Sequence, residues 1–533
     1  MESGDTANVK ESNLGKKFVA SLDIGTTSVR CHIINNKGET IGESSEQVIL
    51  HCPSFGRVEI EPDVLFESIT QVIKNAIKEA DLKASDITVM GISCQRGTFI
   101  TWNKTTGQPY HNFITWQDIR ADSLVQQWNK SITMKALRTG SKCLHLITRN
   151  RRFLAGSVLR LMNAQVTLRL VWVLQNVAGV QEAAKRGDLC FGTVDTWLLQ
   201  RLTGRSDLFV TEVSCASATG LFDPFTMSWA SWAFSLFKLP LNMMPKVCDS
   251  SGRHFGETDA NLFGAPIQIA SLLSDQSASL FGSCCFQEGD AKVTIGTGSF
   301  LNVNTGRKPH ASIAGLYPVV GWKVSDMLVF VAEGLSKDAG TLICWSQSMG
   351  LLGNDPSESM KIATSVSDND GVYFVPAFSG IQAPINDDKS AAGFLGVKRT
   401  SRPPHFLRAV LESIAFRIVQ MHSSLVDETS YKIDKIRVDG GVSRNDFVVQ
   451  LISDLTNTTV ERAKSSEMSV LGAANFAGLE AGIWKDQDEL KSLRKVDREF
   501  EPRKDVASEY DSVFNNWKKA VGRFTGWYGQ ETA

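Results

Sequence analysis

The chain has 533 residues, of which 42% are apolar, 21% charged and 9% aromatic, a composition that excludes global disorder and a fibrous protein. A single hydrophobic core stops growing near roughly 250–300 residues, so this length predicts two large domains. The 56 basic and 57 acidic side chains give a net charge of −1. Because a dedicated nucleic-acid binder needs a basic excess for its phosphate contacts, we expect no nucleic-acid partner.

The start of the chain and the cysteines favour a cytoplasmic protein. Residues 1–17 are polar and lack the apolar stretch of a secretory signal, so we expect a disordered tail there. No apolar run approaches the roughly 18 residues that a membrane span requires. The ten cysteines form no C-x-x-C pair and no zinc-ligand spacing, which argues against a disulfide framework and a structural zinc site.

Short apolar runs alternate with helical periods along the chain, a pattern typical of layered α/β proteins. Strands are expected at residues 18–23, 29–34, 87–93, 99–102, 267–273 and 435–439. Helices are expected at residues 64–80, 168–176, 277–281 and 446–455.

One short sequence occurs twice. Ile24–Ser28 (IGTTS) recurs half the chain later as Ile295–Ser299 (IGTGS), and each copy lies between two expected strands. The echo indicates two related α/β halves that face each other across a cleft. Gly-Thr turns offer backbone N–H and hydroxyl donors, so two facing turns favour a polyphosphate site, although each turn alone also suits an ordinary hairpin.

Known phosphate-binding motifs of other folds do not occur. The sequence lacks G-x-x-x-x-G-K-[ST], which excludes a P-loop protein, and it lacks the motif set of protein kinases. The turn Val438–Asn445 (VDGGVSRN) places a double glycine between a strand and a helix, where a flat ring could approach the backbone. An ordinary tight turn uses the same residues.

Two carboxylates end apolar strands. Asp23 precedes the first Gly-Thr turn, where a carboxylate could hold Mg²⁺ against phosphates, or could simply start the turn. Asp275 follows the run IQIASLLS and opens a helix. It is either a helix N-cap or a general base that takes the proton of an alcohol attacking a γ-phosphate. Gln276 beside it could orient the same alcohol.

A long segment is strongly basic in this neutral chain. Ser123–Gln181 contains no Asp or Glu. Its basic residues are Lys130, Lys135, Arg138, Lys142, Arg149, Arg151, Arg152, Arg160 and Arg169. One interpretation is a solvated insertion, and the other is an electrostatic contact with an acidic partner or an anionic membrane surface.

Nine motifs occur in order along nearly the whole chain: LDIGTTSVR, ISCQR, WQDIR, FGTVDTWLL, SDQSASLFG, TIGTGSF, VPAFSGIQAP, LESIAFR and VDGGVSRN. Together they resemble the FGGY carbohydrate kinase family, and within it the glycerol kinases. The resemblance implies two actin-like (ribonuclease-H-like) α/β domains with an ATP and substrate cleft between them. It places an N-terminal, polyol-side domain at 18–283, with a basic insertion around 145–166, and a nucleotide-side domain at 284–528.

The resemblance also implies the reaction and its residues. The reaction is phosphoryl transfer from ATP to glycerol in the presence of Mg²⁺, giving sn-glycerol 3-phosphate. The implied ATP contacts are Thr26, Thr27, Arg30, Thr297, Gly340, Gly441 and Asn445. The implied polyol contacts are Arg96, Trp116, Asp275, Gln276 and Phe300, with Asp275 as the catalytic base.

The sequence departs from the family pattern in the polyol half of the site. Gly97 stands where glycerol kinases have a glutamate that accepts hydrogen bonds from glycerol, and Ile24 stands where they have glutamine. Their polyol-contacting tyrosine falls near Ala164–Gln165. Two alternatives therefore remain beside a glycerol kinase: a kinase for another polyol or sugar, and a nucleotide-binding regulatory protein. The sequence does not decide between a monomer and a homo-oligomer.

Overall fold

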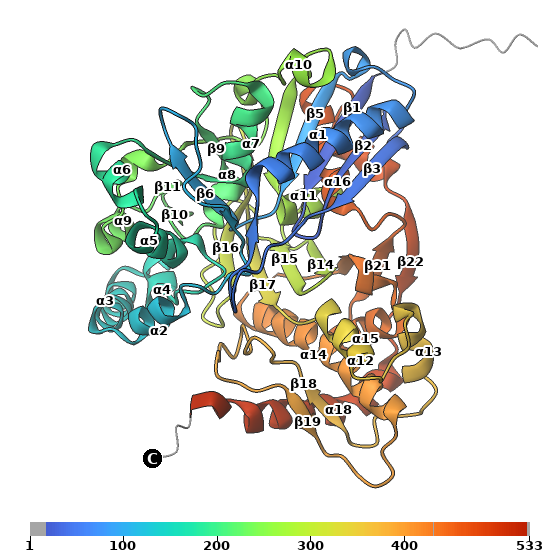
Figure 1. Cartoon of the computed structure of the whole chain (residues 1–533). Coiled ribbons are helices and arrows are strands. Elements are labelled where there is room, and N and C mark those ends of the chain that lie inside the picture. The colour runs from blue at the N-terminus through green and yellow to red at the C-terminus, as the bar shows by residue number, and fades with distance from the viewer. Residues whose placement is uncertain (1–16, 430, 530–533) are drawn as a thin grey trace, which may run out of the picture.

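The computed structural model describes residues 17–429 and 431–529, so all of the expected disordered tail except Lys17 lies outside the described residues. Two β-sheets, one from each half of the chain, lie one above the other and carry helices on both faces (Figure 1). The expected α/β class is confirmed. The expected strands and helices are present, with ends that differ by a few residues.

The first sheet has five strands. Its order is β13 (Ile269–Ser274), β5 (Val89–Cys94), β1 (Phe18–Ile24), β2 (Ser28–Asn35) and β3 (Thr40–Gln47). Strand β1 is buried at every position, as a central strand covered on both faces must be. Helix α1 (Pro62–Glu79) begins with proline, which suits the first position of a helix. Its apolar side chains recur on one side of the helix, and this side packs on one face of the sheet.

The second sheet has seven strands. Its order is β16 (Tyr317–Val324), β17 (Met327–Ser336), β15 (Ser299–Asn304), β14 (Ala291–Ile295), β20 (Lys435–Asp439), β21 (Thr459–Ala463) and β22 (Val496–Phe500). Its helices are α12 (Gly340–Ser348), α13 (Ser359–Ala363), α14 (Pro403–Glu428), α15 (Asp446–Thr456) and α18 (Lys504–Phe524). Helix α17 (Gln487–Leu493) places Leu490 in an apolar cluster that includes Val19 and Ile34 of the first sheet. Trp517 anchors α18, since its buried indole donates to the Phe374 carbonyl at 2.8 Å.

The two sheets share one topology. In the first, β13, β5 and β1 run parallel, and β2 and β3 continue antiparallel. In the second, β21, β20 and β14 run parallel, and β15 and β17 continue antiparallel. The repeated Gly-Thr turn joins the third and fourth strands in both halves. The repeated five-residue sequence therefore lies within an arrangement of five strands that both halves share.

The N-terminal half carries a third, smaller layer at the left of Figure 1. Its sheet is β4 (Glu59–Ile60), β7 (Phe113–Ile114), β6 (Phe99–Asn103) and β8 (Leu189–Thr193). The basic segment forms α2 (Asp122–Lys130), α3 (Ile132–Thr148), α4 (Arg151–Ser157) and α5 (Val166–Asn176). The layer has its own apolar core, to which α9 (Ser231–Phe237) contributes Phe234 and Phe237.

Shorter elements complete the chain. The helices are α6 (Val180–Arg186), α7 (Val194–Thr203), α8 (Val213–Ser217) and α10 (Ala260–Phe263). The strand pairs are β9 (Val210–Glu212) with β12 (Lys246–Cys248), β10 (Phe222–Asp223) with β11 (Ser228–Trp229), and β18 (Tyr373–Val375) with β19 (Gly393–Leu395). No helix within residues 17–429 and 431–529 is long and apolar enough to cross a membrane.

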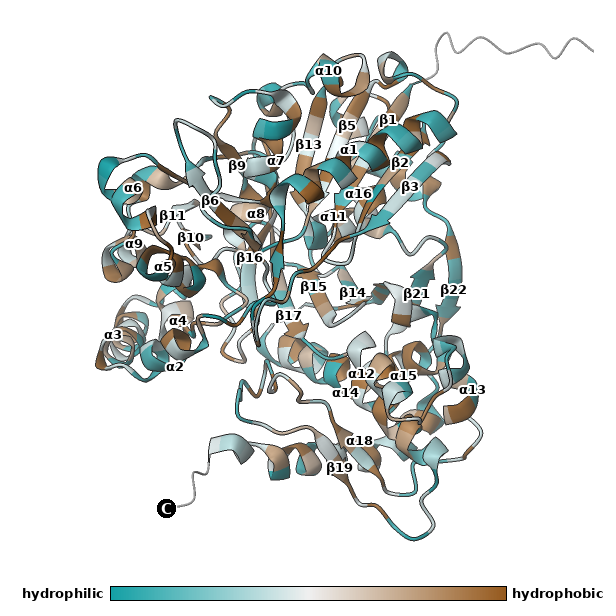
Figure 2. Cartoon of the chain, in the orientation of Figure 1, coloured by the Kyte–Doolittle hydropathy of each residue, from teal (hydrophilic) through white to brown (hydrophobic). Residues whose placement is uncertain are grey.

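Helices α11 (Asp275–Gly282) and α16 (Met468–Glu480) pack closely at the junction of the two halves. Although α16 comes late in the sequence, it lies on the first sheet (Figure 1). Its approach depends on glycine, because a Cβ on Gly472 would lie 1.7 Å from the Ala278 carbonyl oxygen. Figure 2 shows the first sheet as largely hydrophobic beneath helices whose outer faces are hydrophilic.

Candidate active site

A cavity of about 1,230 Å³ lies where the two halves meet. Both Gly-Thr turns, the end of β5, the start of α11 and strand β17 contribute to its walls. The sequence-predicted residues that line it are Thr26, Thr27, Arg96, Trp116, Asp275, Thr297 and Phe300. The structure thus brings together residues that are separated by up to half the chain.

Charged side chains from both halves form a cluster in the cavity wall. Arg96, which follows β5, places its Nε 3.4 Å from Asp275 Oδ1 and its Nη2 2.7 Å from Glu333 Oε2. Asn302 also donates to Glu333 Oε2, at 2.8 Å. We had not identified Glu333 from the sequence. Its only signal is a charge inside the apolar strand β17, and only the fold places that charge opposite Arg96.

Asp275 has the environment of a proton acceptor. It is the first residue of α11, and its Oδ1 accepts from the Gln276 N–H at 2.7 Å. Burial raises the pKa of Asp275, whereas the Arg96 guanidinium opposes that rise. About 28% of its side chain remains exposed, toward the cavity. A carboxylate with a raised pKa accepts a proton more readily than an ordinary aspartate does.

Gln276 does not line the cavity, and its side chain lies behind the residues that do. Its Oε1 accepts from Lys292 Nζ at 3.1 Å, and Lys292 also donates to Ser279 Oγ at 2.9 Å. Ser279 in turn donates to Asp439 Oδ2 at 2.5 Å. Lys292 is fully buried, and burial lowers its pKa. Sequence reasoning missed Lys292, because one lysine in a strand gives no signal until the fold places carboxylates around it.

Each Gly-Thr turn is closed by a hydrogen bond from its first glycine, to a carbonyl three residues on in the first turn and two residues on in the second. The Gly25 N–H donates to the Ser28 carbonyl at 3.0 Å, and the Gly296 N–H donates to the Gly298 carbonyl at 2.9 Å. Trp116 fixes the first turn, since its indole N–H donates to Thr26 Oγ1 at 2.8 Å. Both turns line the same cavity, which is the arrangement that the sequence echo predicts for a site that grips phosphates from two sides.

Asp23 is buried beside the first turn. Its Oδ1 has no hydrogen-bond partner among the described residues. Burial raises the pKa of Asp23 to about 6, and the Arg30 guanidinium acts against that shift. Arg30 lies on β2 and forms an ion pair with Glu467. An unpaired buried carboxylate next to a phosphate turn fits Mg²⁺, which binds one or two protein carboxylates together with phosphate and water oxygens.

Four of the predicted ATP contacts lie outside the cavity lining: Arg30, Gly340, Gly441 and Asn445. The Gly340 N–H donates to the Gly296 carbonyl at 2.9 Å, and a Cβ there would lie 2.6 Å from the same oxygen. Gly441 opens a 3₁₀ turn, Gly441–Arg444, and a Cβ on it would meet none of the described atoms within 4 Å. Asn445 caps α15 and also donates to Ser359 Oγ at 3.2 Å.

Gly97 has a structural reason to be glycine. Its φ is +71°, and a Cβ there would lie 2.8 Å from the Ala164 carbonyl oxygen. Arg169 joins these two segments, because its Nη2 donates to the carbonyls of Gly97 and Ala164 at 2.7 and 2.9 Å. Its other nitrogens donate to the carbonyls of Ile114, Thr115 and Gln165. Burial lowers the pKa of Arg169 to about 9. In the sequence, Arg169 is one of nine basic residues of segment 123–181, and nothing there indicates this structural role.

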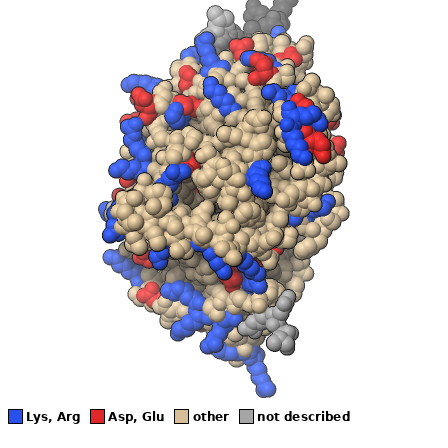
Figure 3. Space-filling view, turned by 90° about the vertical axis from the view of Figure 1, so that its left-hand side faces the viewer, with Lys and Arg blue, Asp and Glu red and all other residues tan. Residues whose placement is uncertain are grey.

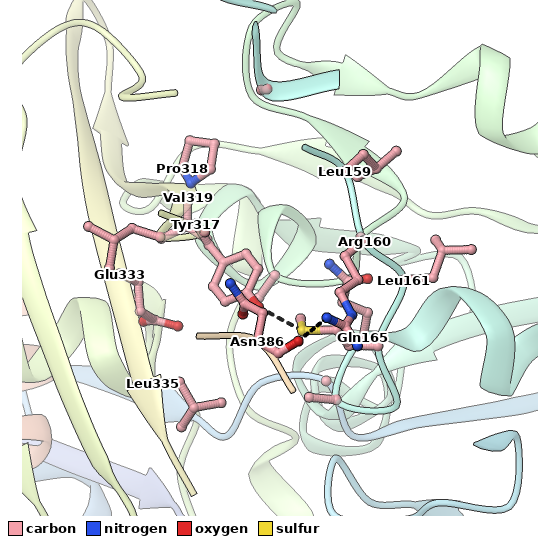
Figure 4. Close-up of a pocket in the computed structure, with 18 of the residues that line it drawn as sticks. Leu159, Arg160, Leu161, Gln165, Tyr317, Pro318, Val319, Glu333, Leu335 and Asn386 are labelled. Carbon is pink, nitrogen blue, oxygen red and sulfur yellow. Dashed lines mark hydrogen bonds between the residues drawn. The ribbon is translucent and has the colours of Figure 1, made fainter. Parts of the chain in front are cut away.

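Arg160 connects the two halves at the edge of the cavity. Its guanidinium donates to the Asn386 carbonyl and lies 2.6 Å from Asp388. Figure 4 shows the segment 159–165 opposite Tyr317 and Glu333, with Arg160 reaching toward Asn386. Ala164 and Gln165, where the family tyrosine was expected, line the same cavity.

Two α/β halves of one topology meet at a cavity that both Gly-Thr turns and a carboxylate line, and this fold is that of kinases of the actin-like, ribonuclease-H-like class. Models of the FGGY family of carbohydrate kinases match the chain, the N-terminal domain over residues 18–282 and the C-terminal domain over 291–481.

Relatives match over the whole length. Glycerol kinase 5 of Bos taurus is 46% identical over 511 residues, 96% of each chain. Glycerol kinase 2 of Thermotoga maritima is 37% identical over 511 residues, 96% of this chain and 99% of the other. The crystal structure of Plasmodium falciparum glycerol kinase with ADP superimposes with a TM-score of 0.83, 28% identity and coverage of 95% and 98%. The chain belongs to the FGGY family of carbohydrate kinases, as its motifs predict.

Proposed function

We propose that the protein is an ATP-dependent glycerol kinase that forms sn-glycerol 3-phosphate and ADP. The observation that carries this proposal is the Arg96–Asp275–Glu333 cluster in the wall of a cavity that both Gly-Thr turns line. The cluster provides a proton acceptor and polar contacts for hydroxyl groups, and the turns provide donors for phosphates. Similarity to animal and bacterial glycerol kinases over nearly the whole chain supports this reaction.

Asp275 acts as the general base. Its carboxylate takes the proton of the primary hydroxyl while that oxygen bonds to the γ-phosphorus and the bond from the γ-phosphorus to the ADP oxygen breaks. Its position at the start of α11 keeps it close to Arg96, whose guanidinium opposes the rise in pKa that burial causes. Arg96 also donates to the hydroxyl oxygens of the polyol.

Glu333 accepts hydrogen bonds from the polyol. Gly97 cannot do so, and Glu333 reaches the same cavity from strand β17. Its Oε2 is held by Arg96 and Asn302, so the carboxylate has a fixed orientation. Trp116 and Phe300 form apolar walls for the carbon backbone of the substrate.

ATP binds with its γ-phosphate at the two Gly-Thr turns and its nucleoside toward Gly340, Gly441 and Asn445. Asp23 holds Mg²⁺, which neutralises phosphate charge when bound. The reaction uses cytoplasmic ATP, and the ten cysteines, all unpaired, suit that reducing compartment.

The test is ADP release by purified protein with MgATP across glycerol, dihydroxyacetone, erythritol, xylulose, ribulose and gluconate. Glycerol turnover well above the polyol-free rate is expected, and Asp275→Asn should retain ATP binding while losing at least about 100-fold in kcat. Turnover only with another substrate would keep the mechanism and change the substrate. No turnover, with ATP still bound, would favour a regulatory protein.

We also propose that the basic segment 123–181 rests on an anionic membrane surface. Helix α3 turns Ile132 and Ile147 outward, with 85% and 80% of each residue exposed, and Lys135 and Lys142 are exposed beside them. Figure 3 shows this side of the molecule, with Lys and Arg over both its upper and lower parts and fewer Asp and Glu in the lower part. Exposed aliphatic side chains flanked by lysines are typical of helices that lie in the headgroup region of a bilayer.

Sedimentation with lipid vesicles tests this proposal. The protein should sediment with vesicles that contain phosphatidylserine and not with phosphatidylcholine vesicles, and Ile132→Asp together with Ile147→Asp should abolish sedimentation. Binding to a soluble acidic protein but not to either vesicle would instead identify an acidic partner.

A further inference from the structure

The cavity is much larger than a polyol requires. Its volume of about 1,230 Å³ exceeds the roughly 300–1,000 Å³ of sites for drug-sized ligands, whereas glycerol has only three carbons. The region around the two turns accommodates phosphates, but a kinase must also keep water away from the γ-phosphate. The part of the cavity that glycerol and the phosphates do not fill would hold water unless another group occupies it.

The surplus space lies under the basic helices. We call it the outer chamber, and its main lining residues are Leu137, Phe153, Leu159, Phe225, Trp232 and Phe237. They come from α3, α4, the segment after α4, the loop after β10, and α9. These side chains form an apolar lining, in contrast to the charged cluster around Asp275.

Two arginines in the outer chamber are already paired. Arg152 lies 2.7 Å from Asp223, and Arg138 donates to the Leu159 carbonyl at 2.8 Å and to Asn129 at 3.0 Å. Paired groups gain little from a polar ligand, whereas the apolar lining gains from any hydrocarbon that removes it from water.

The outer chamber is continuous with the polyol site. Segment 159–165 lines both parts, and Figure 4 shows it running alongside the cavity opposite Glu333. Gly97 and Ala164 lie on this path and carry little or no side chain. A substrate that places hydroxyls near Arg96 could therefore extend a chain past these two residues.

We propose that the preferred substrate is a glycerol with one terminal hydroxyl joined to an aliphatic chain, which occupies the outer chamber while the free terminal hydroxyl is phosphorylated. This inference rests on the proposed kinase activity and specifies its substrate class. The free hydroxyl loses its proton to Asp275 and bonds to the γ-phosphorus, and ADP leaves. Helix α3 lines the chamber with Leu137 and exposes Ile132 and Ile147 on its outer side, so a lipid-like substrate would be supplied from the surface on which α3 rests.

The experiment compares kcat/KM for glycerol with 1-O-butyl-, 1-O-hexyl- and 1-O-octylglycerol below their aggregation limits, with 1-octanoylglycerol to distinguish an ester from an ether link. Each added methylene should raise kcat/KM by up to about fourfold. Phe153→Asp should reduce the ratio of octylglycerol to glycerol turnover by at least about tenfold, and Ala155→Phe, which fills the chamber without adding charge, should do the same. Leu241→Asp, at an exposed leucine outside the chamber, is the matched control.

Titration calorimetry with octylglycerol separates this inference from the kinase proposal. If glycerol is turned over and longer chains bring no gain, the chamber does not bind the chain and the inference is wrong, while the kinase remains. If no compound is turned over, octylglycerol binding that Phe153→Asp weakens still supports the chamber. Absence of such binding overturns it.

Discussion

Glu333 is the residue on which we expect polyol affinity to depend most in this site. Its carboxylate bonds with both Arg96 and Asn302, and it is the acceptor that Gly97 cannot provide. Glu333→Gln should raise the glycerol KM about 10- to 100-fold, because a charge-assisted hydrogen bond contributes about 1.5–3 kcal/mol, with a smaller effect on kcat. Steady-state kinetics check this. Glu428→Gln, at a carboxylate that pairs with His310 outside the cavity, should leave KM unchanged.

Asp23 gives the ligand-free protein a stability that falls as pH rises. Its pKa is raised from 3.8 to about 6, so the folded state binds the proton more tightly than the unfolded state. This contribution is complete below pH 3.8 and is lost as pH rises through about 6, a change of roughly 3 kcal/mol. Asp23→Asn should therefore raise the melting temperature at pH 7.5 and remove most of the stabilisation by MgATP.

A second buried carboxylate provides the contrast. Asp195 Oδ2 accepts from Thr211 Oγ1 at 2.7 Å and from the Glu212 N–H at 3.0 Å, and its Oδ1 accepts from Thr193 Oγ1, so both oxygens have partners. Asp195→Asn should lower the melting temperature, because an amide cannot replace both acceptors. If Asp23→Asn also lowers it, the orphaned oxygen of Asp23 is not a source of instability.

Gly97 shows where sequence reasoning was incomplete. From the sequence alone, restoring a glutamate at this position is expected to improve glycerol binding. In the structure, a side chain would have to adopt φ near +71° and contact the Ala164 carbonyl, which Arg169 holds in place. Gly97→Glu would therefore displace the loop that carries Arg96 rather than add a useful acceptor.

At the scale of elements, α11 positions Asp275 through its contact with α16. A Cβ on Gly472 would lie 1.7 Å from the Ala278 carbonyl oxygen, which belongs to rigid helix backbone. Gly472→Ala should therefore push α11 away, destabilise the protein by about 1–3 kcal/mol or more, and reduce kcat. Denaturant unfolding and steady-state kinetics measure the two effects.

Gly522 in α18 is the matched control for this substitution. A Cβ there meets none of the described atoms within 4 Å, and the residue is exposed. Gly522→Ala should stabilise the protein by about 0.5–1 kcal/mol, because alanine favours a helix more than glycine does. Equal effects at the two glycines would show that close packing of α11 on α16 is not what Gly472 provides.

The strands, hairpins and helices could be predicted because their signals are local. Apolar runs, a proline at a helix start and Gly-Thr turns each act within a few residues. Glu333, Lys292 and Arg169 could not be predicted, because their partners lie on other elements that only the fold brings next to them. Glu333 lies 237 residues from its partner Arg96, and Arg160 lies 228 residues from its partner Asp388. A five-residue echo with four identical positions predicted two related halves, but the shared topology of five strands required the structure.

At the scale of the whole molecule, Arg160 is a direct link across the cleft. Its guanidinium joins the N-terminal half to Asn386 and Asp388 of the C-terminal half, at the edge of the cavity. Arg160→Ala should favour open forms, raise the polyol KM about three- to tenfold, and increase ADP release without polyol, because a less closed cleft admits water.

Kinetics and small-angle X-ray scattering with saturating ligands test this role of Arg160. The variant should keep a larger radius of gyration than the unmodified protein when both are saturated. Arg186→Ala is the control, because Arg186 pairs with Asp188 within the N-terminal half and should change neither quantity. If Arg160→Ala leaves KM, polyol-free ADP release and the radius of gyration unchanged, closure depends on the contact of α11 with α16, and the Arg160 link is only a surface ion pair.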